Sequence, residues 1–266
     1  MSDTYTLYPG TRPLLVSVPH AGTQIAPEVA ADLVPRALAV EDADWHLDRL
    51  YDFAREMGAS LIVPRYARYV VDLNRPPENT PMYPGRNNTE LVPTRFFTGE
   101  PLYREGRVPG DAEVQRRVQR YWRPYHQALQ GELARLKADH GHAMLFDGHS
   151  IQAELPWLFE GRLPDLNVGT ADGAACTPEL REALAQVLQA EPRYSHVIDG
   201  RFKGGYITRH YGRPAEGVQA VQMEMCWHCC MDVALAPRDA WHPELAMGVQ
   251  AVLRRLLETL LAWRPA

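Results

Sequence analysis

Lysine is almost absent from this sequence of 266 residues. Of its 28 basic side chains only Lys137 and Lys203 are lysine, and the others are arginine. With 33 acidic side chains the formal net charge is -5, and no basic run is present that would neutralise a series of phosphates. We therefore expect no nucleic-acid partner. Because arginine is the default cation here, a single arginine carries little functional information.

The sequence also lacks long apolar runs. None reaches the roughly 18 residues of a membrane-spanning helix. The first residues, MSDTYTLYPGTRP, have neither the basic start nor the apolar stretch of a signal peptide. We therefore expect a cytoplasmic protein with no membrane partner.

Cysteine is scarce, and three of the four cysteines lie within five residues: the set is Cys176, Cys226, Cys229 and Cys230. Such crowding is not a disulfide framework. No second pair exists to complete a four-thiolate metal site, so we interpret these cysteines as small buried apolar residues.

The composition, 45% hydrophobic and 23% charged, is that of a globular protein. Short apolar runs alternate with helical patterns, which predicts an α/β sheet. Strands are expected at 14–18, 61–63, 69–73, 143–146, 194–198 and 218–225, and helices at 44–58, 111–140, 177–188 and 243–263. Pro124 should kink or split the helix at 111–140, and the proline-rich segment 74–110 is predicted to be a loop over the site. No linker divides the chain, so residues 1–266 are expected to form a single domain.

Polar residues follow several of these strands, and in open α/β sheets ligands bind at the carboxyl ends of strands. His20 follows the first apolar run, and Asp147 and His149 follow the run at 143–146. An isolated histidine in such a place is usually a cap or turn residue. Asp147, two residues before His149, is suited to orient that ring as acids do beside metal ligands.

An acidic cluster, Glu41, Asp42 and Asp44, lies at the start of the helix predicted at 44–58. Most such carboxylates only complement the helix dipole. One of them would complete a set of two histidines and one carboxylate with an open fourth position. That set is typical of a catalytic zinc site.

Glu224 ends the strand predicted at 218–225, and it shares one face of that strand with Val218, Ala220 and Gln222. A carboxylate on a buried strand must be paired with a positive charge or take part in the function of the protein. It is either the partner of a buried arginine or a general base beside the metal.

Two segments offer cations for an acidic ligand. Asn74 and Arg75, with Arg68 shortly before them, combine an amide with a guanidinium fork that matches a carboxylate. Arg209 follows Gly204 and Gly205, which allow close approach of a ligand but equally suit a plain hairpin.

Taken in order, six motifs resemble the N-formylglutamate amidohydrolase (N-formylglutamate deformylase) family over nearly the whole chain. They are Pro19-His20-Ala21-Gly22, Asp42-Ala43-Asp44-Trp45, Val71-Asp72-Leu73-Asn74-Arg75-Pro76, Asp147-Gly148-His149-Ser150, Gly204-Gly205-Tyr206-Ile207-Thr208-Arg209 and Gln222-Met223-Glu224-Met225. The resemblance implies a three-layer α/β/α fold with a mixed central sheet, like that of the zinc carboxypeptidases.

The same resemblance implies that His20, Asp44 and His149 hold one zinc ion and that Glu224 is the base, with Asp42 as the alternative acidic ligand. It likens Asn74 and Arg75 to a carboxylate-binding pair. The implied reaction is hydrolysis of the small dicarboxylate N-formyl-L-glutamate to formate and L-glutamate in histidine degradation. The alternatives are another zinc amidohydrolase of this fold, acting on N-acyl amino acids or peptidoglycan, and a non-catalytic protein that binds acidic metabolites.

Overall fold

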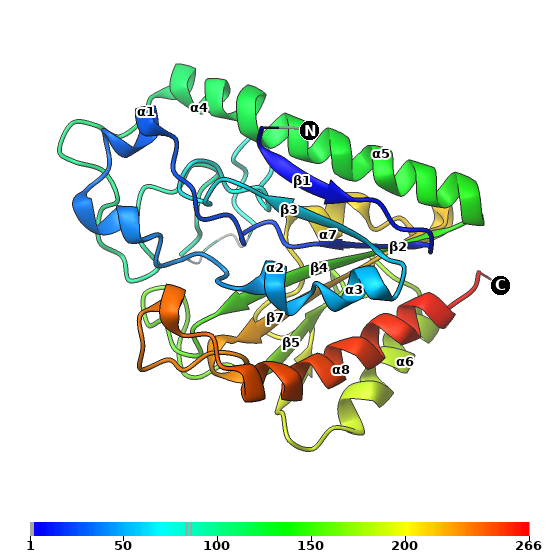
Figure 1. Cartoon of the computed structure of the whole chain (residues 1–266). Helices are drawn as coiled ribbons and strands as arrows, with labels where there is room; N and C mark the ends of the chain where they lie inside the picture. Colours follow the sequence, from blue (N-terminus) through cyan, green and yellow to red (C-terminus); the bar gives the residue numbers. More distant parts are fainter. Residues whose placement is uncertain (1–2, 83–84, 86, 266) are drawn as a thin grey trace.

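A seven-stranded mixed sheet forms the centre of the computed structural model, which describes residues 3–82, 85 and 87–265 (Figure 1). The strand order is β1-β3-β2-β4-β7-β5-β6. Strands β3, β2, β4 and β7 run parallel, whereas β1 is antiparallel to β3, and β5, which pairs in parallel with β6, is antiparallel to β7. The strands are β1 Tyr5–Tyr8, β2 Leu14–Ser17, β3 Ser60–Pro64, β4 Ala143–Ile151, β5 Leu166–Gly169, β6 His196–Ile198 and β7 Val218–Cys226.

Helices cover both faces of this sheet, and each face has its own apolar cluster. One cluster joins side chains of α2, α3, α6 and α8, and the other contains side chains of α1, α5 and α7. Figure 1 shows α4 and α5 on one side of the sheet and α6 and α8 on the other. The helices are α1 Pro27–Ala30, α2 Leu47–Leu50, α3 Phe53–Glu56, α4 Asp111–Arg117, α5 Arg123–His140, α6 Pro178–Gln189, α7 Tyr206–Tyr211 and α8 Pro243–Ala262. The predicted three-layer α/β/α fold with a mixed sheet is confirmed.

The three central strands are the ones whose sequence signal is strongest. All residues of β2 and β4 are buried, and in β7 only Val218 is partly exposed. Parallel strands covered on both faces read as near-continuous apolar runs. The strands predicted at 14–18, 143–146 and 218–225 are therefore confirmed, although β4 extends to Ile151 through the polar residues Asp147 and His149.

The break expected at Pro124 takes the form of a π-helical turn, Val118–Trp122, between α4 and α5. At its end the Arg123 N–H donates to Val118 O, one residue further back than in an α-helix. Proline has no N–H to donate and its ring crowds the preceding turn, so the wider turn accommodates it. The starts of α6 and α8 each have proline in the first turn after a side-chain cap, Thr177 and His242 respectively.

Two predicted elements are wrong. Residues 69–73 are not a strand: the Val70 N–H donates to Ala67 O and the Asp72 N–H to Leu91 O. The apolar side chains of this run are buried all the same, so its hydrophobicity reflects core packing in a turn. The single helix expected at 44–58 is two one-turn helices, α2 and α3, and His46 before them has a left-handed φ of 66°.

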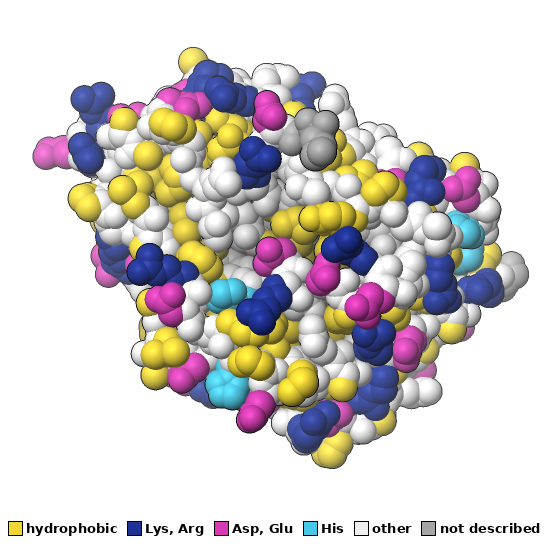
Figure 2. Space-filling model, in the orientation of Figure 1, with side chains coloured by type: hydrophobic (Ala, Val, Ile, Leu, Met, Phe, Trp, Pro, Cys, Tyr) yellow, Lys and Arg dark blue, Asp and Glu magenta, His cyan; other side chains and the backbone are white. Residues whose placement is uncertain are grey.

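The described residues of segment 74–110 contain no helix and no named strand, as predicted. Strands β1 and β5 and helices α1 and α7 were not predicted, because four to six residues give too short a pattern to read. Within the described part of the chain, no helix combines the length and hydropathy needed to cross a membrane. On the face drawn in Figure 2, acidic and basic side chains are intermingled.

Candidate active site

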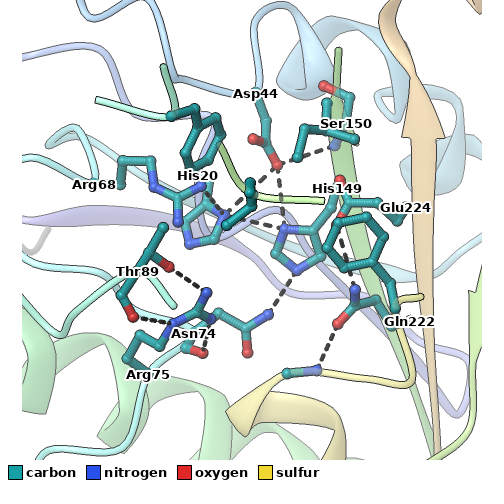
Figure 3. A pocket seen from close by; sticks show the side chains of 15 residues that line it. His20, Asp44, Arg68, Asn74, Arg75, Thr89, His149, Ser150, Gln222 and Glu224 are labelled. Carbon is teal, nitrogen blue, oxygen red and sulfur yellow. Dashed lines mark hydrogen bonds and ion pairs between the residues drawn. The ribbon is translucent and has the colours of Figure 1, made fainter. Parts of the chain in front are cut away.

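A pocket opens at the carboxyl ends of β2, β4 and β7, where the parallel strands of the sheet finish together (Figure 3). Loops following the strands supply His20 and Asp44, β4 supplies His149, and β7 supplies Glu224. The pocket is lined by His20, Asp44, Arg68, Asn74, Arg75, Thr89, Phe97, His149, Ser150, Ile151, Leu158, Phe202, Gly205, Gln222 and Glu224. Loop 74–110 therefore contributes part of its wall, as expected.

Three donor atoms converge in this pocket. His149 Nδ1 lies 3.1 Å from His20 Nδ1 and 3.2 Å from Asp44 Oδ2, and the His20 Nδ1 to Asp44 Oδ2 distance is 3.7 Å. All three side chains are buried. Ligands bound tetrahedrally at about 2.0–2.2 Å are separated from one another by roughly 3.3–3.6 Å. The spacing of these three atoms thus fits a single divalent ion.

The far nitrogen of each ring faces a carboxylate. His20 Nε2 is 2.7 Å from Asp72 Oδ1, and His149 Nε2 is 3.0 Å from Asp147 Oδ2. When the ring proton is on Nε2, where the carboxylate accepts it, the lone pair of each Nδ1 points into the pocket, the arrangement found at metal-bound histidines. The three inward atoms are then all acceptors within 4 Å of one another. A cation between them relieves that repulsion, so the donor set fits a metal.

The structure separates the two acids that the sequence leaves as alternatives. Asp44 belongs to the converging group, and its Oδ2 also accepts the Ser150 N–H at 3.1 Å. Asp42 Oδ2 accepts the Tyr69 hydroxyl at 2.7 Å and the Phe97 N–H at 3.0 Å. Asp42 therefore ties loop 74–110 to the preceding segment and does not line the pocket.

Glu224 faces the same space from β7, where its Cα is paired with that of His149. Its side chain is buried, and burial raises its pKa to about 8 even though the nearby His149 opposes that shift. A carboxyl group whose pKa lies near neutrality can both accept and return a proton. The Glu224 carboxylate accepts a hydrogen bond from Gln222, whose Nε2 lies 3.4 Å from Glu224 Oε2.

Arg68 and Arg75 both line the pocket. The Arg68 guanidinium lies 4.5 Å from the Phe97 ring centroid, and its Nη2 donates to Asp72 Oδ2 at 2.5 Å. Burial alone would raise the pKa of Asp72, but the charge of Arg68 holds it well below its usual value. Arg75 donates from Nε to Thr89 O at 3.1 Å and from Nη2 to the Thr89 hydroxyl. The two guanidinium groups are thus fixed before any substrate arrives.

Asn74 and Arg209 have different surroundings from those two arginines. Asn74 Nδ2 donates to Asp147 Oδ2 at 3.1 Å, and its Oδ1 accepts the Ile207 N–H at 2.8 Å. This amide therefore supports the acid behind His149 as well as lining the pocket. Arg209 lies on α7, where its Nε donates to Gly204 O at 2.8 Å, and it is not among the lining residues.

Sequence reasoning gave no role to Asp72, Thr89 or Gln222. Asp72 and Gln222 stand inside motifs that the sequence did single out, and Gln222 shares a strand face with Glu224. Their functions depend on which partners the fold brings to them. Thr89 lies in the loop and no periodicity marks it.

A second group of metal-type donors, Asp165, His228 and Cys229, lies elsewhere in the described part of the chain. Its acid is already engaged: Asp165 Oδ1 is 2.6 Å from His228 Nε2, and Oδ2 accepts from the Ser195 N–H and hydroxyl. Burial raises the pKa of the Cys229 thiol, which disfavours the thiolate that a metal needs. This group is accounted for as a histidine–aspartate hydrogen bond beside a buried thiol.

Comparison with known proteins identifies the family. The sequence profile of N-formylglutamate amidohydrolase matches residues 12–231. The chain belongs to the N-formylglutamate amidohydrolase family. An N-formylglutamate deformylase of Pseudomonas aeruginosa is 51% identical over 263 residues, covering 99% of this chain and 98% of that protein. One of Pseudomonas putida is 46% identical over 263 residues, covering 99% and 97%.

The fold of this amidohydrolase agrees with that of a solved relative. A crystal structure of N-formylglutamate amidohydrolase from Ralstonia eutropha JMP134 superposes with a TM-score of 0.80 at 25% identity, covering 97% of each chain. The matched range 12–231 contains every residue that lines the pocket. The resemblance read from the six motifs is thereby confirmed.

Proposed function

We propose that this amidohydrolase cleaves N-formyl-L-glutamate to formate and L-glutamate, using one zinc ion held by His20, Asp44 and His149. The observation that carries the proposal is the convergence of two imidazole Nδ1 atoms and one carboxylate oxygen, 3.1–3.7 Å apart, beside a buried glutamate. Two nitrogen ligands and one oxygen ligand, with a position left open, suit catalytic zinc. When bound, the ion would supply Lewis acidity, which lowers the pKa of water to about 7 and polarises a carbonyl.

Glu224 is proposed as the general base. Its carboxylate would accept a proton from the attacking water, whose oxygen bonds to the formyl carbon. The same carboxyl group would return that proton to the amide nitrogen as the C–N bond breaks, so glutamate leaves as an amine and formate retains the new oxygen. Burial raises the pKa of Glu224 toward the range in which one group can take up and return a proton, and the charge of a bound cation would favour the carboxylate form that accepts it.

The substrate carries two carboxylates, while the protein has a net charge of -5. Local cations must therefore supply the attraction. Arg75 is proposed to grip one carboxylate, since Thr89 holds its guanidinium in place and a rigid fork matches two carboxylate oxygens. Arg68 lies nearer the metal ligands, with Nη1 3.5 Å from His20 Nδ1. It would contribute positive charge beside the reacting carbonyl.

Histidine degradation in the cytoplasm is the proposed setting. All four cysteines are free and buried, which supports a compartment where thiols stay reduced.

The test combines three measurements on one preparation: zinc content, formate release from N-formyl-L-glutamate, and formate release after removal of metal by a chelator. We expect about one zinc per chain, turnover, and loss of turnover that added zinc restores. N-Acetyl-L-glutamate serves as the comparison substrate. Binding of formylglutamate without formate release at full zinc occupancy would refute the proposal and favour a binding protein.

A further inference from the structure

Gln222 on β7 contacts Glu224, the proposed base. It lies two residues before Glu224 on the same face of the strand, and it is 4% exposed. Among the described residues, the amide of Gln222 is the one hydrogen-bond donor to the Glu224 carboxylate, at 3.4 Å (Figure 3). Contacts of this kind are often long in ligand-free enzymes and shorten in the complex.

The orientation of the Gln222 amide is fixed from its other end. Oε1 accepts the Gly205 N–H at 2.7 Å. Because that place requires an acceptor, the NH2 group has to point toward Glu224. The side chain of Gln222 therefore joins the backbone N–H of Gly205 to Glu224, and Figure 3 shows the contact between Gln222 and Glu224.

Gly205 packs closely against the side chain of Asn74. A Cβ on this residue would lie 2.4 Å from Nδ2 of Asn74, the amide that supports Asp147 behind His149. Gly205 therefore has contact with Asn74 on one side and with Gln222 on the other. Through Gly205, the amide of Gln222 is connected to Asn74, which donates to the Asp147 carboxylate behind His149.

A base is effective only if the oxygen that takes the proton is aimed at the water, and a carboxylate held by one well-placed donor keeps that aim. We propose that Gln222 is a positioning residue for the proposed hydrolysis: its NH2 group holds one oxygen of Glu224 and leaves the other free to take the proton. This inference rests on the proposed function. In this role Gln222, which also lines the pocket, acts through Glu224 and not directly on the reacting bond.

Two substitutions separate this role from a structural one. Gln222→Glu keeps an acceptor for the Gly205 N–H but replaces the donor with a second carboxyl group. Whether that group is ionised and repels Glu224, or protonated and shares its proton, the base is weakened. Gln222→Met removes donor and acceptor together. We expect both variants to lose roughly 10- to 100-fold in kcat, with KM changed less than about threefold, since misplacement of a catalytic group by about 1 Å can cost 10²-fold.

Gln219 provides the matched control. It lies on the same strand, is 1% exposed, and its Oε1 likewise accepts a backbone N–H, that of Thr177, at 2.7 Å. It does not line the pocket. Gln219→Glu and Gln219→Met should therefore change the melting temperature as much as the Gln222 variants do, while kcat stays at the wild-type value.

A double variant tests the route of the effect. In a Glu224→Gln background, Gln222→Met should cause no further loss of kcat, because a positioning residue acts through the group it positions. Zinc content should match wild type in every variant. Wild-type kcat in both Gln222→Glu and Gln222→Met, or a full additional loss in the double variant, would overturn the inference. If the wild-type protein releases no formate, that result refutes the proposed function and not the role of Gln222 alone.

Discussion

His126 should make this protein sensitive to acid in a way that one substitution can remove. The ring is buried in α5, 4% exposed, and stacks on Trp122 with the ring centroids 3.7 Å apart. Nε2 donates to Leu73 O at 2.8 Å, and Nδ1 lies 2.9 Å from the Tyr211 hydroxyl. Burial lowers the pKa of His126 from 6.5 to about 3, although the Leu73 carbonyl opposes the shift.

The sign of the effect follows from comparing folded and unfolded chains. Below pH 6.5 the unfolded chain protonates this histidine, whereas the folded chain does so only near pH 3. The unfolded state then binds more protons, so stability is complete above pH 6.5 and falls as the pH decreases toward 3. From pH 8 to pH 5 the histidine should lower the free energy of unfolding by about 2 kcal/mol, since each pH unit below 6.5 contributes about 1.4 kcal/mol.

The assay is urea unfolding at pH 8 and at pH 5 for wild type and His126→Gln. Glutamine can still donate to Leu73 O but does not titrate. For His126→Gln, the difference in unfolding free energy between the two pH values should be smaller than that of wild type by about 2 kcal/mol. This holds however much the substitution lowers the unfolding free energy at pH 8. Other titrating groups are common to both proteins and cancel. His140→Gln, at the exposed end of the same helix, should behave as wild type. Equal pH dependence in His126→Gln and wild type would refute the reasoning.

Three further outcomes concern the pocket. His20→Ala or His149→Ala should remove bound zinc and formate release together, measured by metal analysis and turnover, and full zinc retention in both would contradict the ligand assignment. Glu224→Gln should keep fold and zinc but lower kcat by roughly 10²- to 10⁴-fold; a variant that is unstable yet turns over normally would make Glu224 a structural residue. Arg75→Lys should raise KM for formylglutamate, because the point charge of lysine cannot replace the guanidinium fork fixed by Thr89. Unchanged kinetics would mean that another residue binds the substrate carboxylate.

The parts of the fold that the sequence predicts are those in which local pattern and tertiary burial agree. Strands β2, β4 and β7 are covered on both faces, so their apolar runs stand out. The run at 69–73 is also apolar and buried but forms turns, because burial of a side chain does not fix the hydrogen bonds of its backbone. The polar residues that follow the apolar runs predicted His20 and His149 as site residues for a related reason. The carboxyl ends of parallel strands lie at one edge of the sheet, where ligands bind.

The partners of those residues could not be predicted in the same way. Nothing local distinguishes Asp44, which faces His149, from Asp42, which takes the Tyr69 hydroxyl. Gln222 and Gln219 are both buried glutamines on β7, and only the approach of Gly205 to one and Thr177 to the other separates them. Such roles are set by three-dimensional proximity between segments distant in the chain.

The three donors of the pocket differ in what holds them. His149 lies on the central strand β4 and is paired with Glu224 of the parallel neighbour β7, whereas His20 and Asp44 lie outside the strands. Amides of central strands exchange with solvent only when the whole molecule opens, while turns open locally at far lower free energy. We therefore expect ion exchange to follow the local opening of segments 18–22 and 42–46. The lifetime of a bound ion would then be shorter than the lifetime of the folded sheet beneath it.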